Sequence, residues 1–263
     1  MRINSIRPAA VAGTWYPGSA RALTRDVDGY LAAADEAPRG RVDAIIAPHA
    51  GLMFSGPVGA FSYKAAAAAG PFDTAVLLGP SHFVAFDGLA IYPSGAFDSP
   101  LGPARIDEAL AAALLAASPI VQARPAVHGR EHSLEMQLPF LRRLMPDTAI
   151  VPLLMGYQTR ETIQGCAEVL AQIETGGRVL LVASTDLSHY FAAAQAVDLD
   201  RRVQECVSRF DPDGLLELFE QYPEGERGRF VAHGCPTDPP LGKTAEQSSS
   251  RSNPGWTTCD SCS

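Results

Sequence analysis

The chain has very little lysine and no clustered positive charge. Among its 263 residues, 21 are lysine or arginine and 29 are aspartate or glutamate, which gives a formal net charge of −8. Only Lys64 and Lys243 are lysines. Binding to nucleic-acid phosphates requires clustered cationic side chains. The charge balance therefore argues against a nucleic-acid partner.

Long hydrophobic runs are also missing. The N-terminal stretch MRINSIRPAAVAGTWYPGSA lacks the apolar core of a signal peptide, and no later run approaches the roughly 20 apolar residues that cross a bilayer. The five cysteines are an odd number, which does not suit a disulfide framework. These absences predict a cytoplasmic protein without a membrane segment, and the 46% apolar content is enough to form a sizeable core.

Apolar runs of strand length alternate with stretches of helical spacing. Strands are expected at 43–47, 74–79, 89–93, 149–156 and 178–184, and helices at 20–34, 57–69, 105–117, 133–144, 159–173 and 195–209. Such alternation is typical of α/β proteins. We therefore predict a central, largely parallel or mixed sheet flanked by helices.

Three of these expected strands end at histidine or aspartate side chains. They are followed by His49, by His82, and by Asp186 with His189. Because the carboxyl ends of parallel strands meet at one crevice, these side chains are expected to face a common site. Neutral imidazoles joined by one further nitrogen, oxygen or sulfur ligand suit iron, copper or zinc. Each histidine taken alone is equally explained as a loop residue that forms an ordinary hydrogen bond.

Glycines accompany the histidines at the strand ends. Gly51, Gly56 and Gly79 are expected to form sharp turns and to let the main chain approach a bound group closely. Ordinary strand-to-helix turns account for each of them equally well.

A further polar segment, HGREHSLEMQLPFLRRL, spans residues 128–144. His132 and Glu135 are three residues apart, so they are expected to share one face near the start of a helix, where both would point into the crevice and bind substrate. Ser133 is a candidate cap for that helix. A plain amphipathic helix with polar residues at its N-terminus is the alternative interpretation.

Taken together, the motifs resemble the Memo family, which includes the prokaryotic AmmeMemoRadiSam system protein B. The matching segments are RPAAVAGTWYPG at 7–18, APHAGLMFSG at 47–56, LLGPSHF at 77–83, EHSLEMQLPFL at 131–141, VPLLMG at 151–156 and STDLSHY at 184–190. The resemblance covers about residues 5–210. It implies the fold of class III extradiol dioxygenases of the LigB type.

The resemblance also implies a mononuclear site for iron or copper. Its first two ligands would be His49 and His82, and its third would be a cysteine from a motif near the C-terminus. The nearest local match, VAHGCP at 231–236, has His233 at that cysteine's position and Cys235 two residues later. His189 would correspond to the acid/base histidine of the dioxygenases, with Asp186 beside it.

The C-terminal segment differs in character from the rest of the chain. From about residue 222 it is rich in Pro, Gly, Ser and Thr, and it shows no helical or strand periodicity after residue 232. We expect one Memo-like domain over 1–232 and a disordered tail over 233–263. The abrupt change suggests the hypothesis of a frameshifted C-terminus, which would remove the third ligand.

Two main functions are compatible with these features. One is a metal-dependent, dioxygenase-like redox enzyme with an unidentified small substrate. The other is a non-catalytic binding or adaptor protein, whose crevice receives a peptide or a partner such as a radical SAM system protein, as the resemblance implies. A zinc hydrolase is a third possibility, because zinc activates bound water near neutral pH.

Overall fold

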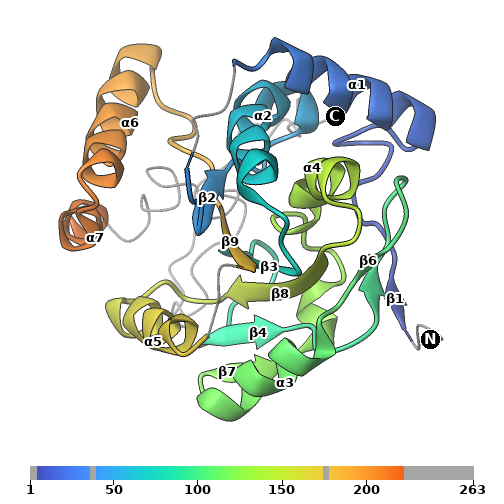
Figure 1. Ribbon diagram of the computed structural model, residues 1–263. Helices are drawn as coiled ribbons and strands as arrows, with labels where there is room; N and C mark the ends of the chain where they lie inside the picture. The colour runs from blue at the N-terminus through green and yellow to red at the C-terminus, as the bar shows by residue number, and fades with distance from the viewer. Residues whose placement is uncertain (1–4, 36–39, 174–177, 222–263) are drawn as a thin grey trace, which may run out of the picture.

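The computed structural model describes residues 5–35, 40–173 and 178–221 and shows a mixed β-sheet flanked by helices (Figure 1). The main sheet has the strand order β2–β9–β3–β8–β4–β7. Its strands are β2 (Ala44–Ala47), β3 (Thr74–Pro80), β4 (Leu89–Ile91), β7 (Val121–Ala123), β8 (Ala149–Met155) and β9 (Val179–Ser184). Only the β4–β8 pair is antiparallel among the pairings of this sheet. The predicted fold class and the five expected strands are confirmed.

Helices cover both faces of this sheet. The helices α1 (Ala20–Ala33), α2 (Leu52–Ala69) and α4 (Leu138–Leu144) contact one another on one face, whereas α3 (Glu108–Ala117) and α5 (Arg160–Ala171) lie on the other (Figure 1). The helices α6 (Ala193–Ser208) and α7 (Pro212–Glu220) form a separate pair. A small second sheet joins β1 (Ile6–Arg7), β5 (Ala96–Phe97) and β6 (Ala104–Arg105). No helix in the described part of the chain is long and apolar enough to span a membrane.

The burial of each strand follows its position in the sheet. The central strands β3 and β8 are buried along almost their whole length, because layers lie against both faces. Strand β2, at the edge, alternates between exposed and buried residues. The strands β2, β9 and β3 are neighbours and parallel, so their carboxyl ends meet at one edge of the sheet.

Local capping sets where several helices begin. The side chains of Ser19, Asp107, Thr159 and Asp211 each accept a hydrogen bond from a backbone N–H in the first turn of the helix that follows. Helix α7 was not among the helices expected from the sequence. Its signal is Asp211 followed by Pro212 in the first turn, a typical helix start.

The segment predicted as one helix over 133–144 is divided instead. Residues Glu135–Gln137 form a 3₁₀ turn, and α4 begins only at Leu138, with Pro139 in its first turn. Ser133 does not cap this helix, because its hydroxyl donates to the carbonyl of Pro80, 2.9 Å away. This change of backbone geometry separates side chains that a regular helix would have placed on one face.

Helix α2 begins at Leu52, earlier than predicted, and includes Pro57. Gly56 therefore lies inside the helix and does not form a turn. A Cβ atom on Gly56 would stand only 2.5 Å from Cε2 of Tyr30. The glycine is needed there to accommodate the Tyr30 ring of α1, and the expected approach to a bound group is not its role.

Candidate metal centre

Three imidazoles gather at the carboxyl edge of the central strands. The ring centroids of His49, after β2, and His82, after β3, lie 5.2 Å apart, with the ring planes at 81°. The centroid of His132 lies 4.4 Å from that of His82 and 5.9 Å from that of His49. The parallel strands thus bring together residues that are up to 83 positions apart in sequence.

Glu131 fixes the orientation of His82. Its Oε1 atom lies 2.8 Å from Nδ1 of His82, and its Oε2 accepts from the backbone N–H of the same residue at 2.6 Å. Because a carboxylate only accepts, Nδ1 of His82 carries a proton, which leaves Nε2 as the nitrogen that could bind a metal ion. Burial alone would raise the pKa of Glu131, but the hydrogen bond and charge of His82 outweigh it and lower the pKa to about 2.

His132 lies between two ring systems. It stacks on His82 with ring planes 21° apart, and the Trp15 ring lies 4.2 Å from it, centroid to centroid. Burial, together with the nearby His82, lowers the pKa of His132 to about 3, so the ring is neutral at pH 7. His132 therefore forms an aromatic wall that supports the His82 ring.

Glu135 does not share this environment. Its carboxylate accepts hydrogen bonds from Arg7 at 2.6 Å and from the Tyr16 hydroxyl at 2.7 Å. It also accepts from the backbone N–H groups of Ala10 and Val11. The side chain is fully buried, so its oxygens bind the N-terminal segment to the core. The expectation that Glu135 points into the crevice with His132 is wrong, because the 3₁₀ turn directs it elsewhere.

Asp186 connects two of the strand-end histidines. Its Oδ1 accepts from the backbone N–H of His49 at 2.6 Å, and its Oδ2 lies 3.5 Å from Nε2 of His189 and 3.8 Å from Nε2 of His49. Burial opposes ionisation, yet the hydrogen bond of His189 and the nearby His49 hold the Asp186 pKa well below its usual range. His189 is the most open of these side chains, with 38% of it exposed.

His49 is the most enclosed imidazole of the cluster. It is 2% exposed, and burial lowers its pKa to about 4 despite the attraction of Asp186. Its Nδ1 lies 2.9 Å from the Ser184 hydroxyl at the end of β9. At neutral pH the ring is uncharged, which is the state that a metal ion requires of a histidine ligand.

The relative placement of His49 and His82 suits a shared metal ion. Two imidazoles that bind one metal at about 2.0–2.1 Å with a tetrahedral angle have centroids about 5 Å apart, close to the 5.2 Å observed. Ligand atoms of His82, Glu131 and His132 also lie within 4.8 Å of one another. However, a ligand imidazole has its metal ion in the ring plane, and the nearly parallel rings of His82 and His132 cannot share one ion in this way. Both oxygens of Glu131 already accept hydrogen bonds from His82, so this carboxylate is a poor third ligand. We therefore favour the pair of His49 and His82.

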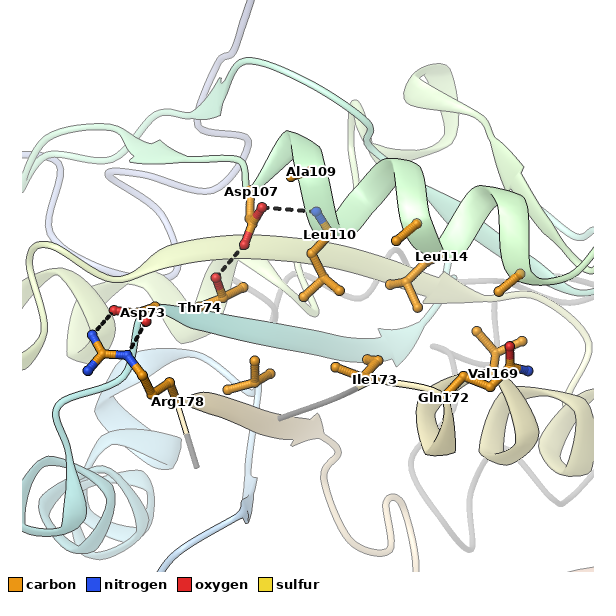
Figure 2. Close-up of a pocket in the computed structure, with 13 residues that line it drawn as sticks. Asp73, Thr74, Asp107, Ala109, Leu110, Leu114, Val169, Gln172, Ile173 and Arg178 are labelled. Carbon is orange, nitrogen blue, oxygen red and sulfur yellow. Dashed lines mark hydrogen bonds and ion pairs between the residues drawn. The ribbon is translucent and has the colours of Figure 1, made fainter. Parts of the chain in front are cut away.

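A cavity lies at the opposite end of the strands. It has a volume of about 720 Å³ and is bounded by α3, α5 and the starts of β3 and β9 (Figure 2). Figure 2 shows apolar side chains along most of its length, with the Asp73–Arg178 ion pair and the Asp107–Thr74 hydrogen bond at one end. It is lined by no histidine or cysteine. The cavity therefore offers no metal-binding side chain, and the imidazole cluster identifies the candidate site.

Part of this cluster, namely His49, His82 and His132, was expected from the sequence. The predicted ligands His233 and Cys235 lie outside the described residues. Glu131 and Ser184 were not predicted to act in the site, although both bond directly to its histidines. In the sequence, only their closeness to His132 and Asp186 indicates a role in the site. Their contacts with His82 and His49 join separate segments of the chain, so no local pattern predicts them.

The arrangement defines a class: an α/β protein with a histidine cluster at the carboxyl edge of its parallel strands. Residues 7–233 match the family model described as Memo-like protein. The chain therefore belongs to the Memo family, whose LigB-like fold agrees with the architecture observed.

Archaeal relatives support this assignment over most of the chain. The sequence is 33% identical over 228 residues to a MEMO1 family protein of Methanopyrus kandleri, covering 82% of this chain and 80% of the relative. It is 34% identical over 231 residues to one of Ignicoccus hospitalis, with the same coverages. A MEMO1 family protein of Methanothermobacter thermautotrophicus is 34% identical over 227 residues, covering 82% and 81%.

Proposed function

We propose that this Memo-like protein binds one iron or copper ion through His49 and His82 and acts as a redox enzyme on a small-molecule substrate. The observation that carries the proposal is the pairing of the His49 and His82 imidazoles, whose centroids lie 5.2 Å apart with nearly perpendicular ring planes, at the crevice edge of the sheet. When bound, such a metal ion supplies redox chemistry toward oxygen and a substrate. The remaining ligand would be His233 or Cys235, the residues at and next to the position where the family resemblance implies a cysteine.

In this proposal His189 exchanges a proton with the substrate. One of its ring nitrogens is directed at Asp186, 3.5 Å away, while the ring is partly open to solvent. A carboxylate that holds one imidazole nitrogen orients the ring and leaves the other nitrogen available for proton transfer. Asp186 would stabilise the charged imidazolium when the ring accepts the proton.

His132 contributes to substrate binding as a flat surface. With Trp15 and Phe83 it forms an aromatic wall next to His82, and the Phe83 ring lies 5.9 Å from His132. Phe83 is 43% exposed, so this wall reaches the surface. A planar or apolar substrate would pack on it and bring its polar groups toward His189.

Exposed apolar side chains favour a second candidate function, that of a binding or adaptor protein. Met53 and Phe54 follow His49 closely in sequence and are 70% and 71% exposed, and Tyr190 follows His189 and is 59% exposed. Large exposed apolar groups of this kind often mark a protein-binding surface. The partner would be a radical SAM system protein or a peptide, and the metal would then have a structural role.

Metal content after anaerobic purification tests the proposal. We expect close to one iron or copper per chain in the wild type, and loss of that metal in His49→Ala and His82→Ala. His128→Gln is the matched control, because the His128 ring packs against Tyr92 and Phe97 and its Nε2 lies 3.2 Å from the carbonyl of Ala90, so the change should leave the metal in place. A folded wild type without metal would contradict the proposal, whereas zinc would favour a hydrolase.

The same samples separate the enzyme from the adaptor. Oxygen consumption that depends on an added aromatic substrate and disappears in His189→Ala, with metal retained, would support redox catalysis. A metal-loaded protein that consumes no oxygen with any substrate, but binds a partner through Met53 and Phe54, would support the adaptor.

A further inference from the structure

A buried chain of hydrogen bonds runs from Tyr63 to His49 through the core. The Tyr63 hydroxyl lies 2.9 Å from Oε1 of Gln137, and Nε2 of Gln137 lies 2.8 Å from the Ser184 hydroxyl. That hydroxyl lies 2.7 Å from the carbonyl of Ser133 and 2.9 Å from Nδ1 of His49. Gln137, Tyr63 and Ser184 are each at most 3% exposed, so water does not offer these groups alternative partners.

The orientation of the Gln137 amide is determined by its surroundings. Its Nε2 lies 3.1 Å from the carbonyl of Pro48, which can only accept a hydrogen bond. The opposite orientation would place the amide oxygen against that carbonyl. The amide nitrogen must therefore face Pro48 and Ser184, and it donates to both.

The Ser184 hydroxyl can then donate its hydrogen to only one acceptor. A hydroxyl has a single hydrogen and two lone pairs. The carbonyl of Ser133 only accepts, so the Ser184 hydrogen goes there. The hydroxyl oxygen is left to accept, from Gln137 and from Nδ1 of His49.

From these hydrogen-bond donors and acceptors we infer that Ser184, oriented by Gln137, is a positioning residue. It holds His49 in the tautomer that is protonated at Nδ1. In that tautomer Nε2 keeps the lone pair that a metal ligand must present. The other tautomer would leave Nδ1 and the Ser184 oxygen as two acceptors facing each other. Its proton on Nε2 would gain no good hydrogen bond from Asp186, whose Oδ2 is 3.8 Å away.

The inference deepens the proposed function, on which its consequence for metal binding rests. His82 is held in the same tautomer by a different group, the Glu131 carboxylate. The tautomers of the two candidate ligands are thus set independently. The Glu131 carboxylate sets that of His82, and the Ser184 hydroxyl sets that of His49. Substitution of Ser184 should therefore affect His49 and leave His82 unchanged.

Nitrogen-15 NMR of the histidine side chains in metal-free protein tests the tautomer directly. Long-range proton–nitrogen correlations distinguish protonated from unprotonated ring nitrogens, and the His49 signals are assigned by their loss in His49→Gln. We expect the wild type to show a protonated Nδ1 and an unprotonated Nε2 at His49. The reverse pattern in the wild type would overturn the inference without any variant being needed.

Variants test the role of the hydroxyl. In Ser184→Ala, Nε2 of Gln137 can donate to Nδ1 of His49, so we expect the protonated nitrogen to become Nε2 and metal affinity to fall at least about tenfold. Ser184→Thr keeps a hydroxyl and should restore both. Tyr63→Phe is the matched control, because it removes a hydroxyl from the same network without touching His49, and it should keep the wild-type tautomer.

The two proposals can fail separately. If the wild type binds no metal but His49 is protonated at Nδ1, the proposed function fails and the tautomer assignment stands. If Ser184→Ala keeps both the wild-type tautomer and the wild-type affinity, the positioning role is overturned although the metal site remains.

Discussion

Nδ1 of His82 and Oε1 of Glu131 lie 2.8 Å apart, and the carboxylate also binds the backbone N–H of the same histidine. The position of Glu131, 49 residues further along the chain, therefore sets the direction of the His82 ring. Carboxylates that hold metal-binding histidines in this way tune both the geometry and the basicity of the ligand. The arrangement leads to a prediction about metal affinity.

Glu131→Gln should weaken metal binding by about 10- to 100-fold. An amide has one acceptor oxygen, so either the ring or the backbone N–H of His82 would face an NH₂ group. Competition with a chelator for Fe(II) or Cu(II) measures the effect. Glu168→Gln, on the exposed side of α5, is the control with the same chemical change, and equal affinities for the two variants would refute the role of Glu131.

The buried ion pair of Arg7 and Glu135 should be far more important for stability than an exposed pair. The two side chains are 3% and 0% exposed, so Glu135→Ala leaves a buried guanidinium without its partner. We expect this variant to lose about 3–5 kcal/mol in free energy of unfolding. Asp28→Ala, which breaks the half-exposed pair with Arg143, should lose less than about 1 kcal/mol.

Urea unfolding of both variants checks this contrast. If the two losses were similar, the Arg7–Glu135 pair would not anchor the N-terminal segment as the contacts indicate. Trp15 belongs to that segment, so a change in its fluorescence in Glu135→Ala would additionally report displacement of the wall beside His132.

His128 should make stability depend on pH. Burial, with the positive charge of Arg7, lowers its pKa from 6.5 to about 3 in the folded protein. Between these values the unfolded chain binds the proton and the folded one does not, so stability is lost as the pH falls from about 6.5 toward 3. From pH 7 to pH 4.5 the contribution of this one residue is on the order of 2 kcal/mol.

The comparison of wild type with His128→Gln isolates this contribution. Other buried groups, including His49 and His132, add to the acid sensitivity of both proteins equally. The wild type should therefore lose more unfolding free energy between pH 7 and pH 4.5 than the variant does. An identical pH dependence would show that His128 is not buried in its neutral form.

The strand ends illustrate what can be predicted from the sequence. An apolar run that stops at a histidine indicates both a buried strand and its functional end, because the side-chain pattern and the chain direction are local properties. His49, His82 and Asp186 were found in this way, and the structure brings them together. The family resemblance rested on the same segments.

Glu135 and Gly56 illustrate what the sequence could not determine. The spacing of His132 and Glu135 indicated a shared face only if the backbone was a regular helix, and a 3₁₀ turn occupies that place. Gly56 was assigned to a turn, whereas it accommodates Tyr30 from another helix. The contacts that hold Glu135, from Arg7 and Tyr16, are distant in sequence, as is the contact of Tyr30 with Gly56. The same is true of Ser184 and His49.

The electron paramagnetic resonance spectrum of the copper-loaded protein tests the central claim most directly. Cu(II) added to metal-free protein at one equivalent should give a single site with coupling to imidazole nitrogens. His49→Ala and His82→Ala should each lose the coupling of one nitrogen, while His128→Gln should match the wild type. A spectrum that is unchanged in either alanine variant would show that the metal is held elsewhere and would contradict the account.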